Sequence, residues 1–151
     1  MYYETALAYK GDIHPFRPYA PAKDREAWAQ VEFCRIGDRK MFEDLYFDRR
    51  RRLNAFVMAE CAEHQGRFLD DIINGVMAIC EESGWQLPAH NNYLDTGSLC
   101  LPDSEAPIID LFAAETAELL AMTSYLLKDE LDQISPVVTK RIHAEIGRRI
   151  L

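Results

Sequence analysis

The apolar residues of this chain recur at intervals of three and four positions over most of its length, a spacing typical of amphipathic helices. Five main helices are predicted in this way, over 24–36, 39–63, 67–83, 107–127 and 135–151. Alternating runs of β-branched residues, which would indicate strands, do not occur. The sequence therefore predicts an all-α fold in which successive helices pair as antiparallel hairpins.

Glycine and proline mark the expected ends of these helices. Gly66 interrupts the pattern after the second helix, and Gly84 is expected to be the C′ residue that ends the third. Pro107 is well suited to the first turn of the fourth helix. Ser135 and Pro136 have the residue types of an N-cap and a first helical position, so the fifth helix is expected to begin there.

The fourth predicted helix is apolar nearly all round, so we expect it to be buried in the core. Two acids fit poorly with that position. Asp110 falls in the first turn, where a negative charge suits the helix N-terminus. Glu115 lies deeper and would need a partner if buried. The sequence leaves open whether that partner is an arginine or whether Glu115 serves the loop that contains His90.

Residues 1–22 are predicted to form an extended arm. Pro15, Pro18 and Pro21 recur at every third position, which forbids a regular helix there. The many aromatic residues of this segment suggest that the arm lies on a surface. Residues 23–151 then make up one helical domain.

Net charge and hydropathy exclude several classes of protein. The 151 residues carry a formal charge of -8 with a pI of about 5.0, which argues against a nucleic-acid binder. No apolar stretch approaches the ~18 residues that a membrane span needs. The N-terminus shows neither a basic n-region nor a long apolar region, so we expect no membrane partner and a cytoplasmic location.

The cysteines and histidines do not form a metal-binding pattern. Cys34, Cys61, Cys80 and Cys100 are widely spaced, and no HExxH motif or paired His/Asp spacing occurs. We expect all four cysteines to be reduced residues in or near the core. No metal and no cofactor are predicted.

An arginine run at 49–52 resembles a nucleic-acid patch, but within a helix its side chains fan round the axis. We expect ion pairs with acids such as Glu43 and Asp48 or with neighbouring helices, the alternative being one arginine directed at an anionic ligand. Glu82 is interpreted as a helix-surface charge, and Arg149 is expected on the solvated side of the last helix.

The loop between the third and fourth helices carries the candidate binding chemistry. Trp85, His90, Asn91 and Asn92 lie close together in sequence in a polar, proline-bounded segment. An aromatic ring can stack on a pyranose face, and amides can pair with hydroxyl groups, so this composition suits a sugar. The alternative is a long connector whose polar residues cap helices and face water.

Three stretches, in this order along the chain, resemble the N-terminal helical domain of the heparinase II/III-like polysaccharide lyases. They are YFDRRRRLNAFVMAEC at 46–61, ICEESGWQLPAHN at 79–91, and the segment from PIIDLFAAETA to the end at 107–151. The resemblance covers about residues 24–151. It implies that the helices open an incomplete (α/α) toroid, which in the family is followed by a β-sandwich region.

The resemblance also implies a reaction class. Enzymes of this family cleave uronic-acid polysaccharides by β-elimination: an Asn or His neutralises the C5 carboxylate, and Tyr and His move the protons. The family's Asn-Trp motif and catalytic Tyr would follow Leu151, where this chain stops in mid-pattern, so we expect a fragment that is inactive alone and assign it no catalytic residue. The missing C-terminal part of the same polypeptide would then be a partner of this chain. The sequence also leaves open whether the chain forms a homo-oligomer.

The implied ligand is an acidic poly- or oligosaccharide, and the implied substrate-binding residues are Trp85, His90, Asn91, Asn92 and Asp110. A second hypothesis belongs to another class: a stand-alone helical module that binds carbohydrate or protein without catalysis. The reading frame after Leu151 separates the two, because a downstream Asn-Trp and Tyr would favour the lyase and a stop codon the module.

Overall fold

The computed structural model describes residues 2–12, 26–91 and 101–151, and within them it is helical with no strand. The all-α prediction is therefore confirmed for this part of the chain. The elements are α1 (Tyr2–Asp12), α2 (Glu26–Ile36), α3 (Lys40–Glu63), α4 (Leu69–Cys80), the short 3₁₀ turn η2 (Pro88–His90), α5 (Leu111–Leu126), α6 (Lys128–Ile134) and α7 (Pro136–Arg149).

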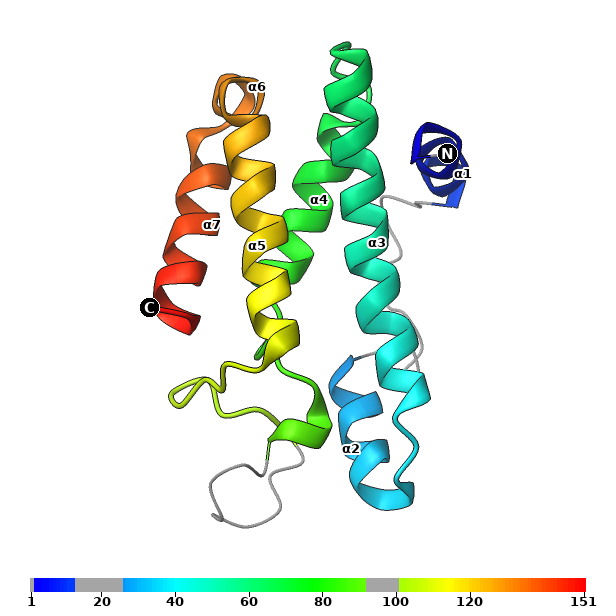
Figure 1. Cartoon of the computed structure of the whole chain (residues 1–151), viewed down its shortest axis with the longest axis vertical. Coiled ribbons are helices and arrows are strands. Elements are labelled where there is room, and N and C mark those ends of the chain that lie inside the picture. Colours follow the sequence, from blue (N-terminus) through cyan, green and yellow to red (C-terminus); the bar gives the residue numbers. More distant parts are fainter. Residues whose placement is uncertain (1, 13–25, 92–100) are drawn as a thin grey trace.

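Four helices form the body of the molecule in two layers (Figure 1). The chain ascends in α3, returns in α4, ascends again in α5 and returns in α7. α3 packs on α4 and on α5, and α7 packs on the same two helices. Helices α3 and α5 therefore run parallel in one layer, and α4 and α7 run parallel in the other, which gives two antiparallel hairpins side by side.

The core lies between these layers and continues under the loop after α4. Its buried side chains come from all four helices and that loop, and they include Phe56, Ile72, Trp85, Leu120 and Ile142. A smaller cluster of Ala29, Phe42, Tyr46 and Leu87 joins α2 to the start of α3 and to the loop.

The prediction of an extended arm is wrong for residues 2–12, which form α1 on the outside of α3. The prolines begin only at Pro15, so they leave the preceding residues free to be helical. Tyr3 packs edge-on against Phe68, and Ala6, three residues later, is fully buried. The rest of the arm, 13–22, and the expected N-cap Asp24 lie outside the described residues.

The turn between α3 and α4 follows the sequence prediction. His64 takes a left-handed conformation with φ of 49°, and Gly66 follows with φ of 73°. The buried carboxylate of Glu60 accepts hydrogen bonds from the backbone N–H groups of Gly66 (2.6 Å) and Phe68 (3.0 Å). These bonds satisfy donors that a tight turn would otherwise leave without partners.

The fourth predicted helix begins later and is more exposed than expected. Asp110 has an extended backbone and caps the helix, because its Oδ1 accepts the N–H of Ala113 at 2.7 Å, so Pro107 lies before the helix and not in its first turn. The pattern also breaks at Leu127, which separates α5 from α6. α5 covers the core with one side only, and Glu115 is exposed.

Gly84 does not end α4 as a C′ glycine, since Glu81 caps that helix and Gly84 has no positive φ. It is required for space instead. A Cβ atom on Gly84 would lie 2.7 Å from the Cβ of Pro102 and 2.6 Å from Oε1 of Gln86. The loop after α4 and the segment before α5 therefore touch at a point where only a glycine fits.

Replacing Gly84 by Ala should lower the free energy of unfolding by about 1–3 kcal/mol, because the added methyl group overpacks this contact. Gly147→Ala is the matched control: it lies inside α7 with nothing within 4 Å of the new Cβ. That change should raise stability by about 0.5–1 kcal/mol through helix propensity. Urea unfolding of both variants measures the contrast, and equal effects would contradict the close approach at Gly84.

Candidate functional site

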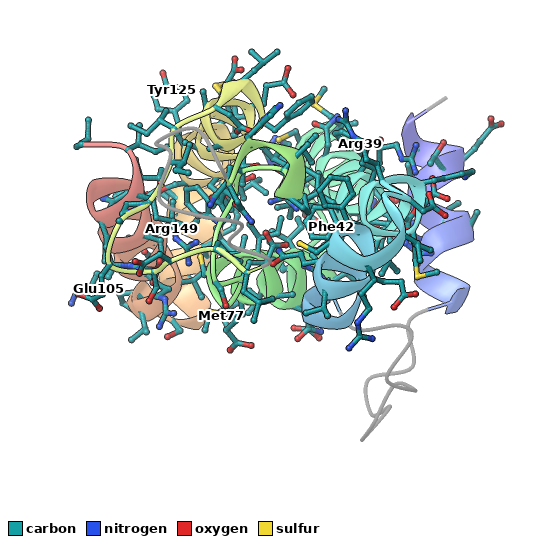
Figure 2. The ribbon with its side chains drawn as sticks, turned by 90° about the horizontal axis from the view of Figure 1, so that it is seen from below. Arg39, Phe42, Met77, Glu105, Tyr125 and Arg149 are labelled. Atoms are coloured by element: carbon teal, nitrogen blue, oxygen red, sulfur yellow. The ribbon has the colours of Figure 1, made fainter. Side chains whose placement is uncertain are left out.

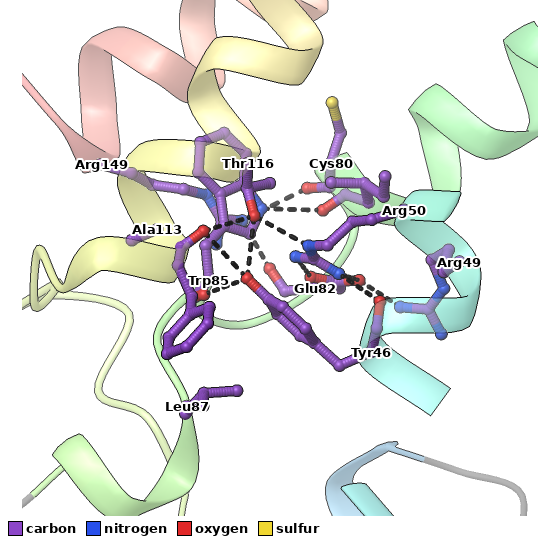
Figure 3. A network of polar contacts seen from close by, with 12 residues as sticks. Tyr46, Arg49, Arg50, Cys80, Glu82, Trp85, Leu87, Ala113, Thr116 and Arg149 are labelled. Carbon is purple, nitrogen blue, oxygen red and sulfur yellow. Dashed lines mark hydrogen bonds and ion pairs between the residues drawn. The ribbon is translucent and has the colours of Figure 1, made fainter. Parts of the chain in front are cut away.

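A buried ion pair holds the loop after α4 against α3 (Figure 3). The guanidinium of Arg50 donates to both carboxylate oxygens of Glu82, at 3.1 and 2.7 Å, and Arg49 pairs with the same carboxylate. The side chains of Arg50 and Glu82 are 10% and 2% exposed. The prediction that the arginine run is salt-bridged is confirmed, but the interpretation of Glu82 as a surface charge is wrong.

Two hydroxyl groups extend this pair across the layer to α5. Arg50 Nε lies 2.8 Å from Thr116 Oγ1, which lies 2.8 Å from the hydroxyl of Tyr46. The Tyr46 hydroxyl in turn lies 2.7 Å from the carbonyl oxygen of Trp85. Arg50 donates to Thr116 Oγ1, which donates its single hydrogen to the carbonyl oxygen of Phe112 at 2.7 Å, and the Tyr46 hydroxyl donates to the Trp85 carbonyl oxygen. Three segments far apart in sequence are thus joined by one cluster of polar contacts around Thr116 and Tyr46.

The environment of Tyr46 changes its acidity. Burial raises the pKa of its phenol to about 12, against a partial lowering by the Arg50 guanidinium, whose Cζ lies 3.2 Å from the centre of the ring. The phenol therefore stays protonated through the neutral range and remains a donor to the Trp85 carbonyl oxygen.

Trp85 is a core residue, so the prediction that its ring is a stacking surface for a sugar is wrong. It is 1% exposed and belongs to the main apolar cluster. Its indole Nε1 donates to the carbonyl oxygen of Ile79 at 3.0 Å. One face of the ring meets the Arg149 guanidinium, whose Cζ lies 4.6 Å from the ring centre.

Arg149 is buried as well, at 5% exposure, contrary to its predicted place on the solvated side of α7. Its Nε donates to Glu145, and its Nη2 donates to the carbonyl oxygens of Cys80 and Glu82. Arg149 therefore ties the end of α7 to the C-terminal end of α4 and to the loop that follows it.

The amides of the candidate loop have different outcomes. Asn91 is 4% exposed, and its Oδ1 accepts a hydrogen bond from Gln86 Nε2 at 3.0 Å. Its side chain therefore braces the loop from within and is not available to a sugar in this conformation. Asn92 lies outside the described residues, so its predicted role stays a prediction.

His90 and Asp110 are the predicted site residues that the structure brings together. His90 Nδ1 lies 2.5 Å from Asp110 Oδ2, which also accepts the Leu87 N–H at 3.0 Å. The imidazole stacks on Phe112, with ring centres 6.2 Å apart and an interplanar angle of 18°. Since the carboxylate accepts, Nδ1 carries the hydrogen and the lone pair of the neutral ring is on Nε2.

Their exposure gives the two residues different roles. The imidazole side chain is 29% exposed, whereas the Asp110 carboxylate is 9% exposed and accepts three hydrogen bonds. Asp110 is therefore a positioning residue that fixes the ring and begins α5. His90 is the part of the pair that a ligand can reach.

A groove between α3 and α5, of about 400 Å³, was not predicted from the sequence. Its floor includes Tyr46, Arg50 and Thr116, and its walls carry Met58 and Met122, both about two-fifths to one-half exposed. The volume lies within the range of small-ligand sites. The sequence signal that was available is the apolar surplus of α5, which one buried side of a helix cannot absorb.

Cys61 and Cys80 are free thiols, as expected, and among the described cysteines Cys80 is buried, Cys61 is partly buried and Cys34 is exposed. Cys100 lies outside the described residues. Among the described residues no cluster of His, Cys, Asp and Glu is arranged to hold a metal ion. None of the helices in the same part of the chain combines the length and the hydrophobicity that a membrane span requires.

Comparison with known proteins adds no assignment to this geometry. No protein-family model matches the chain, and no curated protein matches it significantly.

Breaking the buried pair should strongly destabilise the fold. Glu82→Gln leaves the Arg50 guanidinium buried without a countercharge, which we expect to cost about 3–5 kcal/mol of unfolding free energy. Glu81→Gln removes an exposed carboxylate one residue earlier and should change stability by no more than about 0.5 kcal/mol. Chemical denaturation of both variants tests this, and equal stability losses would contradict the structural role of Glu82.

The raised pKa of Tyr46 should lower the stability of the folded protein at alkaline pH. Its pKa of about 12 in the fold lies above the ordinary value of 10.0, so between these pH values the unfolded chain loses a proton that the folded chain keeps. Stability should fall by about 2–3 kcal/mol as the pH rises through this window. Tyr46→Phe should remove this part of the pH dependence, whereas Tyr125→Phe, at an exposed phenol, serves as the control.

Proposed function

We propose that this chain is the opening helical part of an (α/α) toroid in a heparinase II/III-like polysaccharide lyase, where it contributes to the binding of a uronic-acid saccharide. The motifs at 46–61, 79–91 and 107–151 support the family. The alternation of helices between two layers, each with its helices parallel, is compatible with the start of a toroid.

The arrangement of His90 is the observation that carries the proposed binding role. Within the described part of the 81–91 loop, the imidazole is oriented by a carboxylate, stacked on an aromatic ring and still reachable by solvent. It also lies at the N-terminal end of α5, where the helix dipole favours a negative charge. A uronate carboxylate or hydroxyl group is therefore the ligand group that this corner suits.

The remaining loop residues are then supports rather than contacts. Trp85 and Asn91 hold the loop from the inside, and Asp110 fixes the tautomer and direction of His90. Such outer residues decide whether a contact residue keeps its geometry when the ligand arrives. In this proposal Trp85, Asn91 and Asp110 support the site, and His90 makes the contact with the saccharide.

The proposed reaction needs more than this chain supplies. β-Elimination requires neutralisation of the C5 carboxylate and a base within hydrogen-bond reach of the C5 proton. We assign His90 to binding and assign no residue of this chain to the proton transfers. The chain by itself should accordingly form no unsaturated uronate from acidic glycans.

A saccharide titration tests the role of His90. Uronic-acid oligosaccharides from alginate, hyaluronan and heparin are added to the chain, and the imidazole signals are followed by NMR. At least one should shift the His90 signals, and His90→Ala should weaken that binding about tenfold, the loss of roughly one charge-assisted contact. A neutral maltooligosaccharide controls for nonspecific sugar contact.

His143→Ala is the matched variant, because His143 is an exposed histidine on α7 and should leave binding unchanged. The binding role is refuted if none of the acidic oligosaccharides moves the His90 signals. It is also refuted if both histidine variants weaken binding equally.

A second candidate function, a non-catalytic interaction module, is favoured by a different observation. The groove between α3 and α5 exposes apolar side chains and lies outside the loop that the sequence motifs mark. A soluble monomer seldom leaves such a surface uncovered without a use for it. Association through this face in the absence of any saccharide would support the module.

A further inference from the structure

We propose that the groove between α3 and α5 is a self-association surface, which takes α3 and α5 of a second copy of this chain across a two-fold axis parallel to the helices. The proposal rests on the residues that line the groove and does not depend on the saccharide role of His90. The residues that carry it are Arg51, Asn54 and Met58 on α3, and Glu115, Glu118 and Met122 on α5.

The charges of the groove are segregated by helix. Arg51 stands on the α3 side with its side chain 65% exposed, and within the described residues it forms a 3.8 Å ion pair with Asp48. Glu115 and Glu118 stand exposed on the α5 side, and in the ranges that the structure describes neither has an ion-pair partner. One wall is thus positive and the other negative at the same part of the groove.

The two walls are also in register along the helix axes. Arg50 Nε bonds Thr116 Oγ1 at 2.8 Å, so their neighbours Arg51 and Glu115 lie at about the same height. The helices run in the same direction, and one further heptad leads from Arg51 to Met58 and from Glu115 to Met122. On each wall, the charged residue is therefore followed by a methionine about 10 Å further along the helix axis.

A two-fold axis that lies in the groove, parallel to the helices, places α3 of one copy opposite α5 of the other at equal heights. Arg51 then meets Glu115 and Glu118 of the second copy, and Met58 meets its Met122. An axis perpendicular to the helices would instead oppose α3 to α3 and α5 to α5, which sets like charges against each other. The charges on the two walls therefore favour a second copy of this chain as the partner, related by a two-fold axis parallel to the helices.

The face beside the groove is apolar enough for such a contact. Tyr125 is 81% exposed at the end of α5, and Leu126 next to it is 39% exposed and lines the groove. Figure 2 shows Tyr125 on the opposite side of the molecule from Met77, which belongs to the other layer. The exposed apolar residues of α5 therefore gather on the α3–α5 side of the bundle.

The test is a pair of charge-reversed variants studied by sedimentation equilibrium. Arg51→Glu makes both walls negative, and the double variant E115R/E118R makes both walls positive. Each alone should dissociate at least about tenfold more readily than the unmodified chain, because like charges now face each other. Mixed in equal amounts, the two variants should form a one-to-one heterodimer, since both Arg–Glu levels are then restored.

Lys140→Glu, an equal charge change at an exposed position of α7, should leave the association unchanged. Circular dichroism shows whether each variant keeps its helices, and the recovery on mixing excludes misfolding as the cause of dissociation. The proposal is overturned if the unmodified chain is monomeric at all concentrations, as expected if other helices cover the groove. It is equally overturned if the mixed variants do not associate.

Discussion

The ion pair between Arg50 and Glu82 is the interaction on which the rest of this structure depends. It is withdrawn from water and joins the middle of α3 to the loop after α4, more than thirty residues later. Its hydroxyl extension through Thr116 and Tyr46 reaches α5 and the backbone of the loop. A buried pair of this kind gains little net stability over an apolar pair, but removing one partner leaves the other charge buried without compensation, so the two side chains must stay together.

That constraint explains why the candidate loop has so little side chain left for a ligand. Glu82 is fixed from one side by Arg50, and the Glu82 carbonyl oxygen is fixed from the other by Arg149. Trp85 is then drawn between α4 and the end of α7, where its ring is covered. The loop leaves the core only at η2, and its first described side chain with both a fixed orientation and solvent contact is His90.

The same network leaves the outer side of the α3–α5 layer uncovered. Arg50 and Tyr46 fill the space between the two helices from below, so the helices meet through polar groups and remain apart at the surface. The groove above this floor has charged walls and methionine walls at alternate heights. This surface has no partner within the described parts of the chain, which leaves it open to a second copy, and it is separate from the corner that contains His90.

The sequence by itself determined the helices, because their signals are local. The three-and-four spacing located α3 and α7 to within one or two residues, and the glycine and serine at their borders act through the backbone of neighbouring residues. It also predicted that the arginine run forms ion pairs, since four adjacent arginines on a helix require acids nearby. His90 and Asp110 were both predicted to bind substrate, but Asp110 was placed in the first turn of the helix after the loop, and their contact was not predicted.

Only the tertiary structure decided which members of these sets are buried. Arg50 and Arg51 have the same chemistry and adjacent positions, yet one is enclosed by Glu82 and the other faces the open groove. Trp85 and His90 lie five residues apart in one motif, yet one fills the core and the other reaches solvent. Such choices depend on contacts between residues thirty to seventy positions apart, and the local spacing of side chains carries no information about them.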